Sequence, residues 1–347
     1  MAEFLQQVVS GLATGGIYAS LAVAIVLIYR TTRVVNFAQG EMGMFATFIA
    51  LWLLDAGWPY WGAFSATLAM AFAGGVLLER AVIQTVDRPP ELTAVVVAAG
   101  AAIVVLWTIA GWPPWATSLT TAAVVLVAGA LLLWLPKRPI ERAPAVTVVI
   151  VTIGLLIALN GAAFWIWGGE TRSFPSAFST RPIHVGGVAF SIQDFGIIGV
   201  SLGAVALLYL FFRFTKLGLG LRAAALNPDA SRLVGVRVGW MLALGWGLAA
   251  VLAALSAMMV APLVFLDPNM MRPVLVYALA AGILGGLDSL LGAVVGGLAI
   301  GVGLNLVSTY VGFVGDELKL PVAFVVFLGV LVVRPAGLFG RIAVRRV

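Results

Sequence analysis

The sequence contains no cysteine and only one histidine, His184, among its 347 residues. The absence of cysteine excludes a disulfide framework and any metal site built from thiolates. Charged residues make up only 10% of the chain, whereas a soluble domain carries roughly 25%. A soluble fold could not cover a chain that is 62% hydrophobic, so the composition predicts a membrane protein. His184 lies in a long polar segment, which is typical of a solvated loop residue rather than a ligand.

Long apolar runs are abundant instead. About 20 apolar residues are needed to cross the hydrocarbon core as a helix, and ten runs of roughly this length are present. They lie near residues 5–29, 34–54, 60–79, 92–111, 117–135, 145–167, 195–213, 240–262, 290–310 and 320–334. A shorter, glycine-interrupted run at 273–286 predicts either a short span or a re-entrant segment. The predicted fold class is therefore all-α, a polytopic transmembrane helical bundle of about 10–11 spans.

The positive charges are distributed unevenly between the loops. Of the 20 basic residues, 16 fall in one alternating set of loops, and the other set holds Arg172, Arg181, Arg272 and Lys319. Basic residues mark the cytoplasmic loops of membrane proteins. The sequence thus predicts a multi-pass protein of the cytoplasmic membrane with its C-terminus inside. The N-terminus lies outside if the run at 273–286 crosses the membrane.

One predicted span carries several polar groups near its start. At about 100° per residue of helix, its small and polar residues fall on one face, namely Asn36, Gln39, Gly40, Gly43 and Thr47. Polar residues inside a membrane usually face a bundle interior or a water-filled path. We therefore expect this polar stripe to line or border a substrate pathway, the alternative being that it serves helix packing alone.

Other polar residues within predicted spans favour a structural role. Glu41 points away from the polar stripe, so we expect it to fix helix packing through a hydrogen bond or to be protonated. Asn160 and Asn305 are expected to form hydrogen bonds between helices. Glycines at small-xxx-small spacing, such as Gly11 and Gly15, predict close helix packing. The pairs Gly292/Gly296 and Gly297/Gly301 have the same spacing.

Two regions between spans have distinct patterns. Glu79-Arg80-Ala81 and Glu141-Arg142-Ala143 each lead into an apolar span, which suggests that about 80–140 is a duplication or an insertion of two helices. The basic segment 214–239 contains Asn227-Pro228-Asp229, a pattern typical of a helix start, and Gly235 suits its end. A two-turn helix is not stable alone in water, so it either docks on a partner or is an ordinary connection.

Taken together, these motifs resemble the permease subunits of branched-chain amino-acid ABC importers, a family that includes urea and amide permeases. The resemblance is carried by Asn36-Phe37-Ala38-Gln39-Gly40-Glu41, Thr152-Ile153-Gly154-Leu155, Ile166-Trp167-Gly168-Gly169, Leu221–Gly235, Ala281–Ser289 with Gly292-Ala293 and Gly296-Gly297-Leu298, and Arg334-Pro335-Ala336-Gly337-Leu338-Phe339-Gly340. The family usually has histidine where this chain has Gln39, and its pattern is shorter than this chain around 80–140.

The resemblance implies a single permease domain over residues 1–347. It implies a second permease subunit in a heterodimer, two cytoplasmic ABC ATPase subunits and an extracytoplasmic substrate-binding protein. The segment 214–239 would be the ATPase-coupling loop, and its contacting residues would be Asn227, Pro228, Asp229, Arg232, Leu233 and Gly235.

The chain itself has no nucleotide-binding motif. Its lysines are Lys137, Lys216 and Lys319, and none has the glycine before it and the serine or threonine after it that a Walker A sequence requires. ATP would therefore bind to the partner ATPases, and no cofactor, metal site or catalytic residue is expected in this chain. The expected cargo is a branched-chain or other small neutral amino acid. Urea or a short amide is the alternative cargo, and an ATP-independent transporter and a membrane enzyme are the remaining alternatives.

Overall fold

The structure is a computed structural model that describes residues 2–83, 145–179, 181–185, 188–312, 314–315, 318–334 and 337–340. The chain divides into two compact units, residues 1–76 with 152–347, and residues 77–151. The described elements of the first half are α1 (Ala2–Thr32), α2 (Gln39–Asp55), α3 (Tyr60–Leu78), the short π-helix η1 (Glu79–Ile83) and α7 (Ala145–Trp167). The later elements are β1 (Pro182–Val185), β2 (Val188–Ser191), α8 (Ile192–Phe214), α9 (Lys216–Leu226), α10 (Pro228–Leu233), α11 (Val238–Val264), α12 (Met271–Gly285), α13 (Leu290–Tyr310) and α14 (Lys319–Val333).

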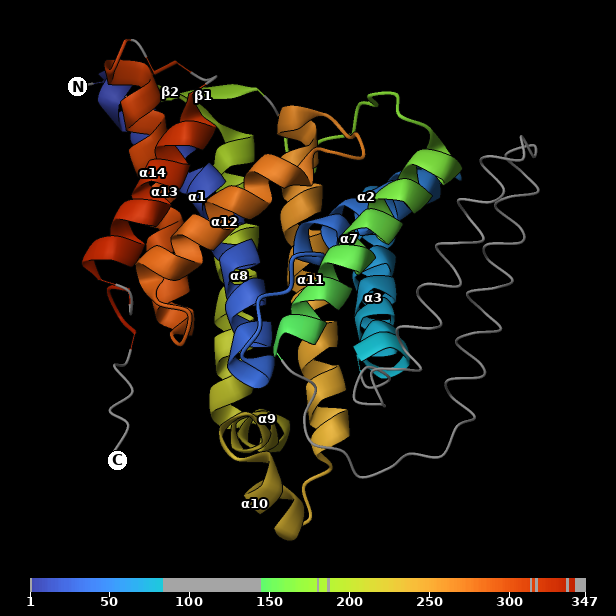
Figure 1. The fold of residues 1–347 in the computed structure, drawn as a ribbon. Coiled ribbons are helices and arrows are strands. Elements are labelled where there is room, and N and C mark those ends of the chain that lie inside the picture. Colours follow the sequence, from blue (N-terminus) through green and yellow to red (C-terminus); the bar gives the residue numbers. More distant parts are fainter. Residues whose placement is uncertain are drawn as a thin grey trace, which may run out of the picture. The chain divides into compact units, whose positions relative to one another are not determined.

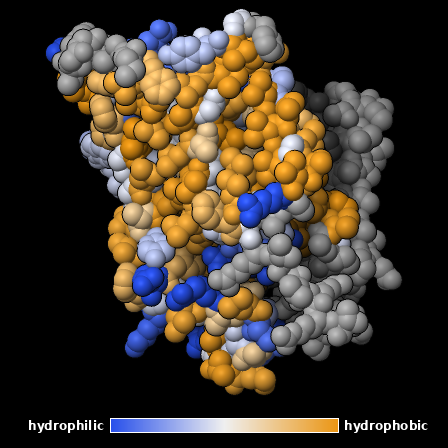
Figure 2. Space-filling model, turned by 90° about the vertical axis from the view of Figure 1, so that its left-hand side faces the viewer, coloured by the Kyte–Doolittle hydropathy of each residue, from blue (hydrophilic) through white to orange (hydrophobic). Residues whose placement is uncertain are grey.

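Six of the predicted spans are confirmed as helices long and apolar enough to cross a membrane: α1, α3, α7, α8, α11 and α13. Helices α12 and α14 are shorter apolar helices of 15 residues each. The spans predicted at 92–111 and 117–135 lie outside the described residues. Most of the suggested insertion at about 80–140 lies outside them as well. Hydrophobic residues cover most of the face shown in Figure 2, between hydrophilic residues near its upper and lower ends. The described part of the chain is thus an all-α, multi-pass membrane protein.

Helix α1 forms the centre of the first unit. It is the most buried of the six long apolar helices, with 83% of its apolar window inside the structure, and it packs on α13, α11, α8 and α12. Glycines allow the closest of these approaches. A Cβ atom added at Gly11 would lie 2.7 Å from Val302 Cα, and one at Gly15 would lie 2.9 Å from Leu298 Cα. The predicted role of small residues in helix packing is therefore confirmed at the α1–α13 contact.

The apolar run at 273–286 forms one continuous helix, α12. At about 1.5 Å per residue, its 15 residues extend for about 22 Å, which is less than the roughly 30 Å of a hydrocarbon core. In Figure 1 it runs obliquely beside α13. The C-terminal segment closes its end, because the backbone N–H groups of Leu338 and Phe339 donate to the carbonyls of Leu284 and Gly285 at 2.8 and 3.1 Å. Carbonyls at a helix end need such partners.

The segment between α8 and α11 contains two short helices rather than the single one predicted. The helix at Asn227–Gly235 is confirmed as α10, but α9 was expected to be loop. Gly218 and Gly220 lower the helix propensity of α9, which is why the sequence pattern did not predict a helix there. Two interactions compensate for this weakness: Thr215 caps the helix by accepting a hydrogen bond from the Gly218 N–H at 2.9 Å, and Leu221 is buried.

Candidate functional site

The polar segment identified in the sequence begins outside a helix. Helix α1 ends at Thr32 and α2 begins at Gln39, so the predicted span at 34–54 starts five residues too early, and Asn36 does not lie on a helical turn. The physical reason is local. The Asn36 side-chain oxygen accepts a hydrogen bond from the Ala38 N–H at 3.0 Å, and asparagine favours such turns over a helix interior. Non-helical backbone at membrane depth is tolerated only where protein or a cavity surrounds it, and Asn36 is fully buried.

Two amide side chains connect this turn to helix α11. Asn36 donates through Nδ2 to Gln39 Oε1 at 2.9 Å, and Gln39 donates through Nε2 to the carbonyl of Ala249 at 2.7 Å. Both side chains are fully buried. The Gln39 oxygen therefore satisfies the Asn36 donor, and the Gln39 donor joins the start of α2 to the middle of α11.

The rest of the polar stripe packs against neighbouring helices. A Cβ atom added at Gly43 would lie 2.5 Å from the Ala253 carbonyl oxygen, and one at Gly40 would lie 3.4 Å from Met271 Cβ. Thr47 is buried and donates to the Gly43 carbonyl at 2.9 Å. The structure thus places Gln39 and Gly43 against α11 and Gly40 against α12, with Asn36 in the preceding turn and Thr47 bonded to Gly43 within α2. Their role in a substrate pathway stays a prediction.

Glu41 takes part in a separate polar cluster. Asn160 of α7 donates to Glu41 Oε2 at 3.4 Å and to the Pro268 carbonyl at 2.7 Å, while Arg272 Nη2 donates to Asn160 Oδ1 at 3.4 Å. The expected interhelical hydrogen bonds are therefore present for Asn160, and they are also present for Asn305, which donates to the side chain of Gln7 at 2.8 Å. Sequence reasoning missed that Asn160 and Glu41 are partners, although both are polar residues in apolar helices.

The predicted coupling helix α10 has the expected ends. Asn227 caps it by accepting from the Ala230 N–H at 3.0 Å, with Pro228 in the first turn. Gly235 follows the helix with φ of +84°, a conformation that favours glycine. Asp229 and Arg232 form an exposed ion pair at 3.2 Å.

The apolar side chains at the end of α10 are exposed. Leu233 is 89% exposed and the adjacent Val234 is 78% exposed. Figure 1 shows α9 and α10 beyond the lower ends of α1 and α8. The arrangement therefore presents a capped helix with exposed apolar residues outside the main bundle.

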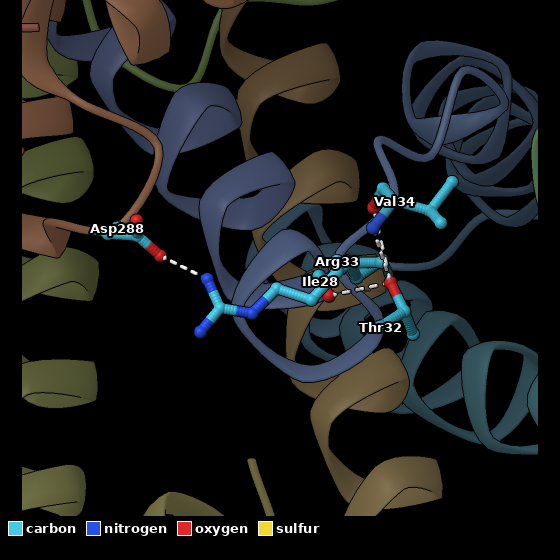
Figure 3. A network of polar contacts seen from close by, with 5 residues as sticks. All are labelled: Ile28, Thr32, Arg33, Val34 and Asp288. Atoms are coloured by element: carbon cyan, nitrogen blue, oxygen red, sulfur yellow. Dashed lines mark hydrogen bonds and ion pairs between the residues drawn. The ribbon is translucent and has the colours of Figure 1, made fainter. Parts of the chain in front are cut away.

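A further polar network lies at the turn after α1 (Figure 3). Arg33 has a left-handed φ of 60° and forms an ion pair with Asp288 at 2.7 Å. The Thr32 hydroxyl donates to the Ile28 carbonyl at 2.9 Å and accepts from the Val34 N–H at 3.3 Å. The ion pair links the segment before α2 to the α12–α13 turn. The sequence showed Asp288 only as the flank of an apolar run and did not predict its partner.

Comparisons with known proteins show what the sequence is similar to. Residues 90–333 match the family model described as branched-chain amino acid transport system, permease component. The permease protein LivH of the high-affinity branched-chain amino acid transport system of Escherichia coli K12 is 25% identical over 99% of this chain and 98% of its own length. The corresponding permease protein BraD of Pseudomonas aeruginosa is 27% identical over the same shares of the two chains.

A further sequence relative and a comparison with a solved structure complete these findings. A probable branched-chain amino acid transport permease protein LivH of Methanocaldococcus jannaschii is 25% identical over 92% of this chain and 87% of its own. PsaBC from Streptococcus pneumoniae in complex with Fab is 13% identical with a TM-score of 0.39, covering 96% of this chain and 92% of that one. Because the family model spans more than half of the residues, the chain belongs to the family of permease components of branched-chain amino-acid transport systems.

Proposed function

We propose that this chain forms the translocation pathway of an ATP-driven importer for branched-chain or other small neutral amino acids. It would do so with a second permease subunit, two cytoplasmic ABC ATPases and an extracytoplasmic binding protein. The observation that carries the proposal is α10, a well-capped helix whose apolar residues have no cover within the described chain. The names of the relatives LivH and BraD, both branched-chain amino acid permeases, support the choice of cargo.

Helix α10 is the proposed ATPase contact. Six residues cannot sustain a helix in water without packing against something else, and Leu233 and Val234 supply an apolar surface for a groove on a soluble partner. Asn227 and Pro228 fix where the helix starts, and the Asp229–Arg232 pair keeps its exposed side soluble. The positive-inside rule supports placing α10, and with it the C-terminus, on the cytoplasmic side.

Removing the two exposed apolar side chains tests this contact. We expect the double variant Leu233→Ser with Val234→Ser to lose co-purification with the ATPase subunits while the permease still assembles in the membrane. The matched control is Ile183→Ser, since Ile183 is also an exposed apolar residue but lies in the β1–β2 hairpin. Undiminished co-purification of the double variant would reject α10 as the docking element.

The polar stripe is the proposed border of the pathway. In this structure Gln39 is tied to α11 through the Ala249 carbonyl, so exposing the stripe to a substrate would require α2 and α11 to separate. Its amide groups and small residues suit a small neutral or zwitterionic solute. If Asn36→Ala and Gln39→Ala leave uptake unchanged at equal expression, the stripe serves packing alone.

A further inference from the structure

A surface pocket lies between the start of α9 and the start of α11. Its volume is about 450 Å³, within the range of roughly 300–1,000 Å³ that is typical of sites for small molecules. It is lined by Lys216, Leu217, Gly220, Gly235, Val236, Arg237, Trp240, Met241 and Leu244. No residue of α10 itself lines the pocket, but Gly235, the last of the proposed coupling residues, does, so the pocket borders the coupling element.

The pocket combines positive charge with an apolar lining. Lys216 and Arg237 are its charged residues, and none of the described residues that line it is acidic. The carboxylate of Asp229 in α10 is paired with Arg232. Leu244, Met241 and the other apolar residues supply the remaining surface. This combination suits a ligand with an anionic head and an apolar body.

The position of α9 indicates what surrounds the pocket. Figure 1 shows α9 almost along its own axis, whereas α1, α8 and α11 run up the page, so α9 lies across the direction of the spanning helices. Its large side chains at Leu217 and Leu219 are exposed, and so is Phe214 just before it. A helix with exposed apolar residues, placed across the ends of spanning helices, lies in the plane of a membrane surface.

Aromatic and basic residues close to α9 in the fold support its placement at a membrane surface. Trp240 lines the pocket and is 45% exposed, and tryptophan gathers at the level of lipid headgroups. The Arg213 guanidinium lies 5.7 Å from the centre of the exposed Phe214 ring, so a basic and an aromatic side chain stand together just before α9. Basic pockets between spanning helices bind the headgroups of anionic lipids.

We propose that this pocket binds an anionic phospholipid. The phosphate of the headgroup would pair with Lys216 and Arg237, and the upper parts of the acyl chains would lie against Leu217, Trp240 and Leu244. The lipid would contact both α9 and α11 and so restrict the motion of α9 relative to α11. Helix α10, which follows α9, would then be held in a fixed position. The proposal requires no ATPase subunit and can be tested on the permease alone.

Native mass spectrometry of the purified permease tests the proposal. The protein is equilibrated with equal amounts of phosphatidylglycerol and phosphatidylcholine, and the retained lipid is identified. We expect wild-type protein to retain phosphatidylglycerol preferentially, and the double variant Lys216→Gln with Arg237→Gln to retain about tenfold less of it. Arg181→Gln is the matched control, because Arg181 is an exposed basic residue beside the β1–β2 hairpin.

Each remaining outcome contradicts the proposal. Equal retention of the two lipids by wild-type protein, or undiminished phosphatidylglycerol retention by the double variant, would reject a lipid site. Displacement of the lipid by millimolar inorganic phosphate would identify a site for a small anion instead. If the double variant lost co-purification with the ATPase but kept its lipid, the pocket would be a protein contact. Single variants at Lys216 and Arg237 keep the test valid if the double variant does not fold.

Discussion

At the scale of single residues, the turn at Asn36 shows how a side chain can pair a backbone group that has left a helix. The turn before α2 leaves helical hydrogen bonding, and the Asn36 side chain replaces part of it by binding the Ala38 N–H. The sequence predicted that Asn36 and Gln39 share one face of a helix, and the structure joins their side chains by a hydrogen bond. The prediction placed Asn36 on the same helix as Gln39 by applying helical spacing to the whole segment. In the structure the asparagine turn precedes the helix, and α2 begins only at Gln39.

The first residue prediction concerns Gln39. Gln39→Leu removes the donor to the Ala249 carbonyl and the oxygen acceptor of the buried Asn36 amide, which keeps only the weak Met42 Sδ acceptor at 3.6 Å. A buried polar group without a good partner costs about 1–3 kcal/mol. We expect a clearly lower melting temperature in detergent. Gln6→Leu makes the same exchange at an exposed position of α1 and should have little effect. Equal melting temperatures for both variants would show that the amide pair contributes no stability.

The second residue prediction concerns Asn160. Asn160→Ala removes the donor that reaches both the buried Pro268 carbonyl and Glu41, so we expect less assembled protein in the membrane, measured by size-exclusion chromatography after extraction. The neighbouring polar residue Asn269 has only a marginal contact with Asn160, at 3.5 Å, and Asn269→Ala serves as the control. Normal assembly of Asn160→Ala would contradict a structural role for this cluster.

At the scale of elements, glycine spacing predicted which helix faces pack closely, but it did not predict which two helices pack together. The pairs Gly11/Gly15 and Gly297/Gly301 were predicted to lie on packing faces, and the structure joins them to each other across α1 and α13. Helical periodicity indicates which residues share a face. It carries no information on the partner helix, because many faces of this apolar chain have similar composition.

A substitution at this contact should therefore be severe. We expect Gly15→Leu to lower the melting temperature strongly or to prevent assembly, since the new side chain would meet the backbone at Leu298 and overpacking costs about 1–3 kcal/mol or more. Gly203→Leu in α8 is the control, because a Cβ atom there would meet no described atom within 4 Å. The contact would be less tight than described if both variants melted at the wild-type temperature.

At the scale of the whole molecule, charge predicted an orientation and hydropathy predicted the six helices that are long and apolar enough to cross a membrane. It also predicted spans at 34–54 and 320–334, where the structure has the shorter helices α2 and α14 of 17 and 15 residues. The pattern could not predict α9, because a helix of 11 residues lacks the long apolar run of a span. The shorter run at 273–286 was recognised in the sequence, and the structure confirms a short apolar helix there, α12. Orientation itself is a prediction that the absence of native cysteine makes simple to test.

Single cysteines at the two ends of the bundle should be labelled from opposite sides. We expect a membrane-impermeant maleimide to label Ile183→Cys in spheroplasts and Leu233→Cys only in inside-out vesicles, because basic loops such as the one holding Arg232 stay in the cytoplasm. Wild-type protein, which has no cysteine, gives the background. Labelling of Leu233→Cys in intact spheroplasts would reverse the predicted orientation.

Uptake by proteoliposomes tests the central claim most directly. The permease is reconstituted with its partner permease, ATPases and binding protein, and entry of radiolabelled leucine is compared with entry of radiolabelled urea. We predict that leucine accumulates only when ATP and the ATPase subunits are present, and that urea does not accumulate. Leucine accumulation by the permease alone, or driven by an ion gradient without ATP, would contradict the account.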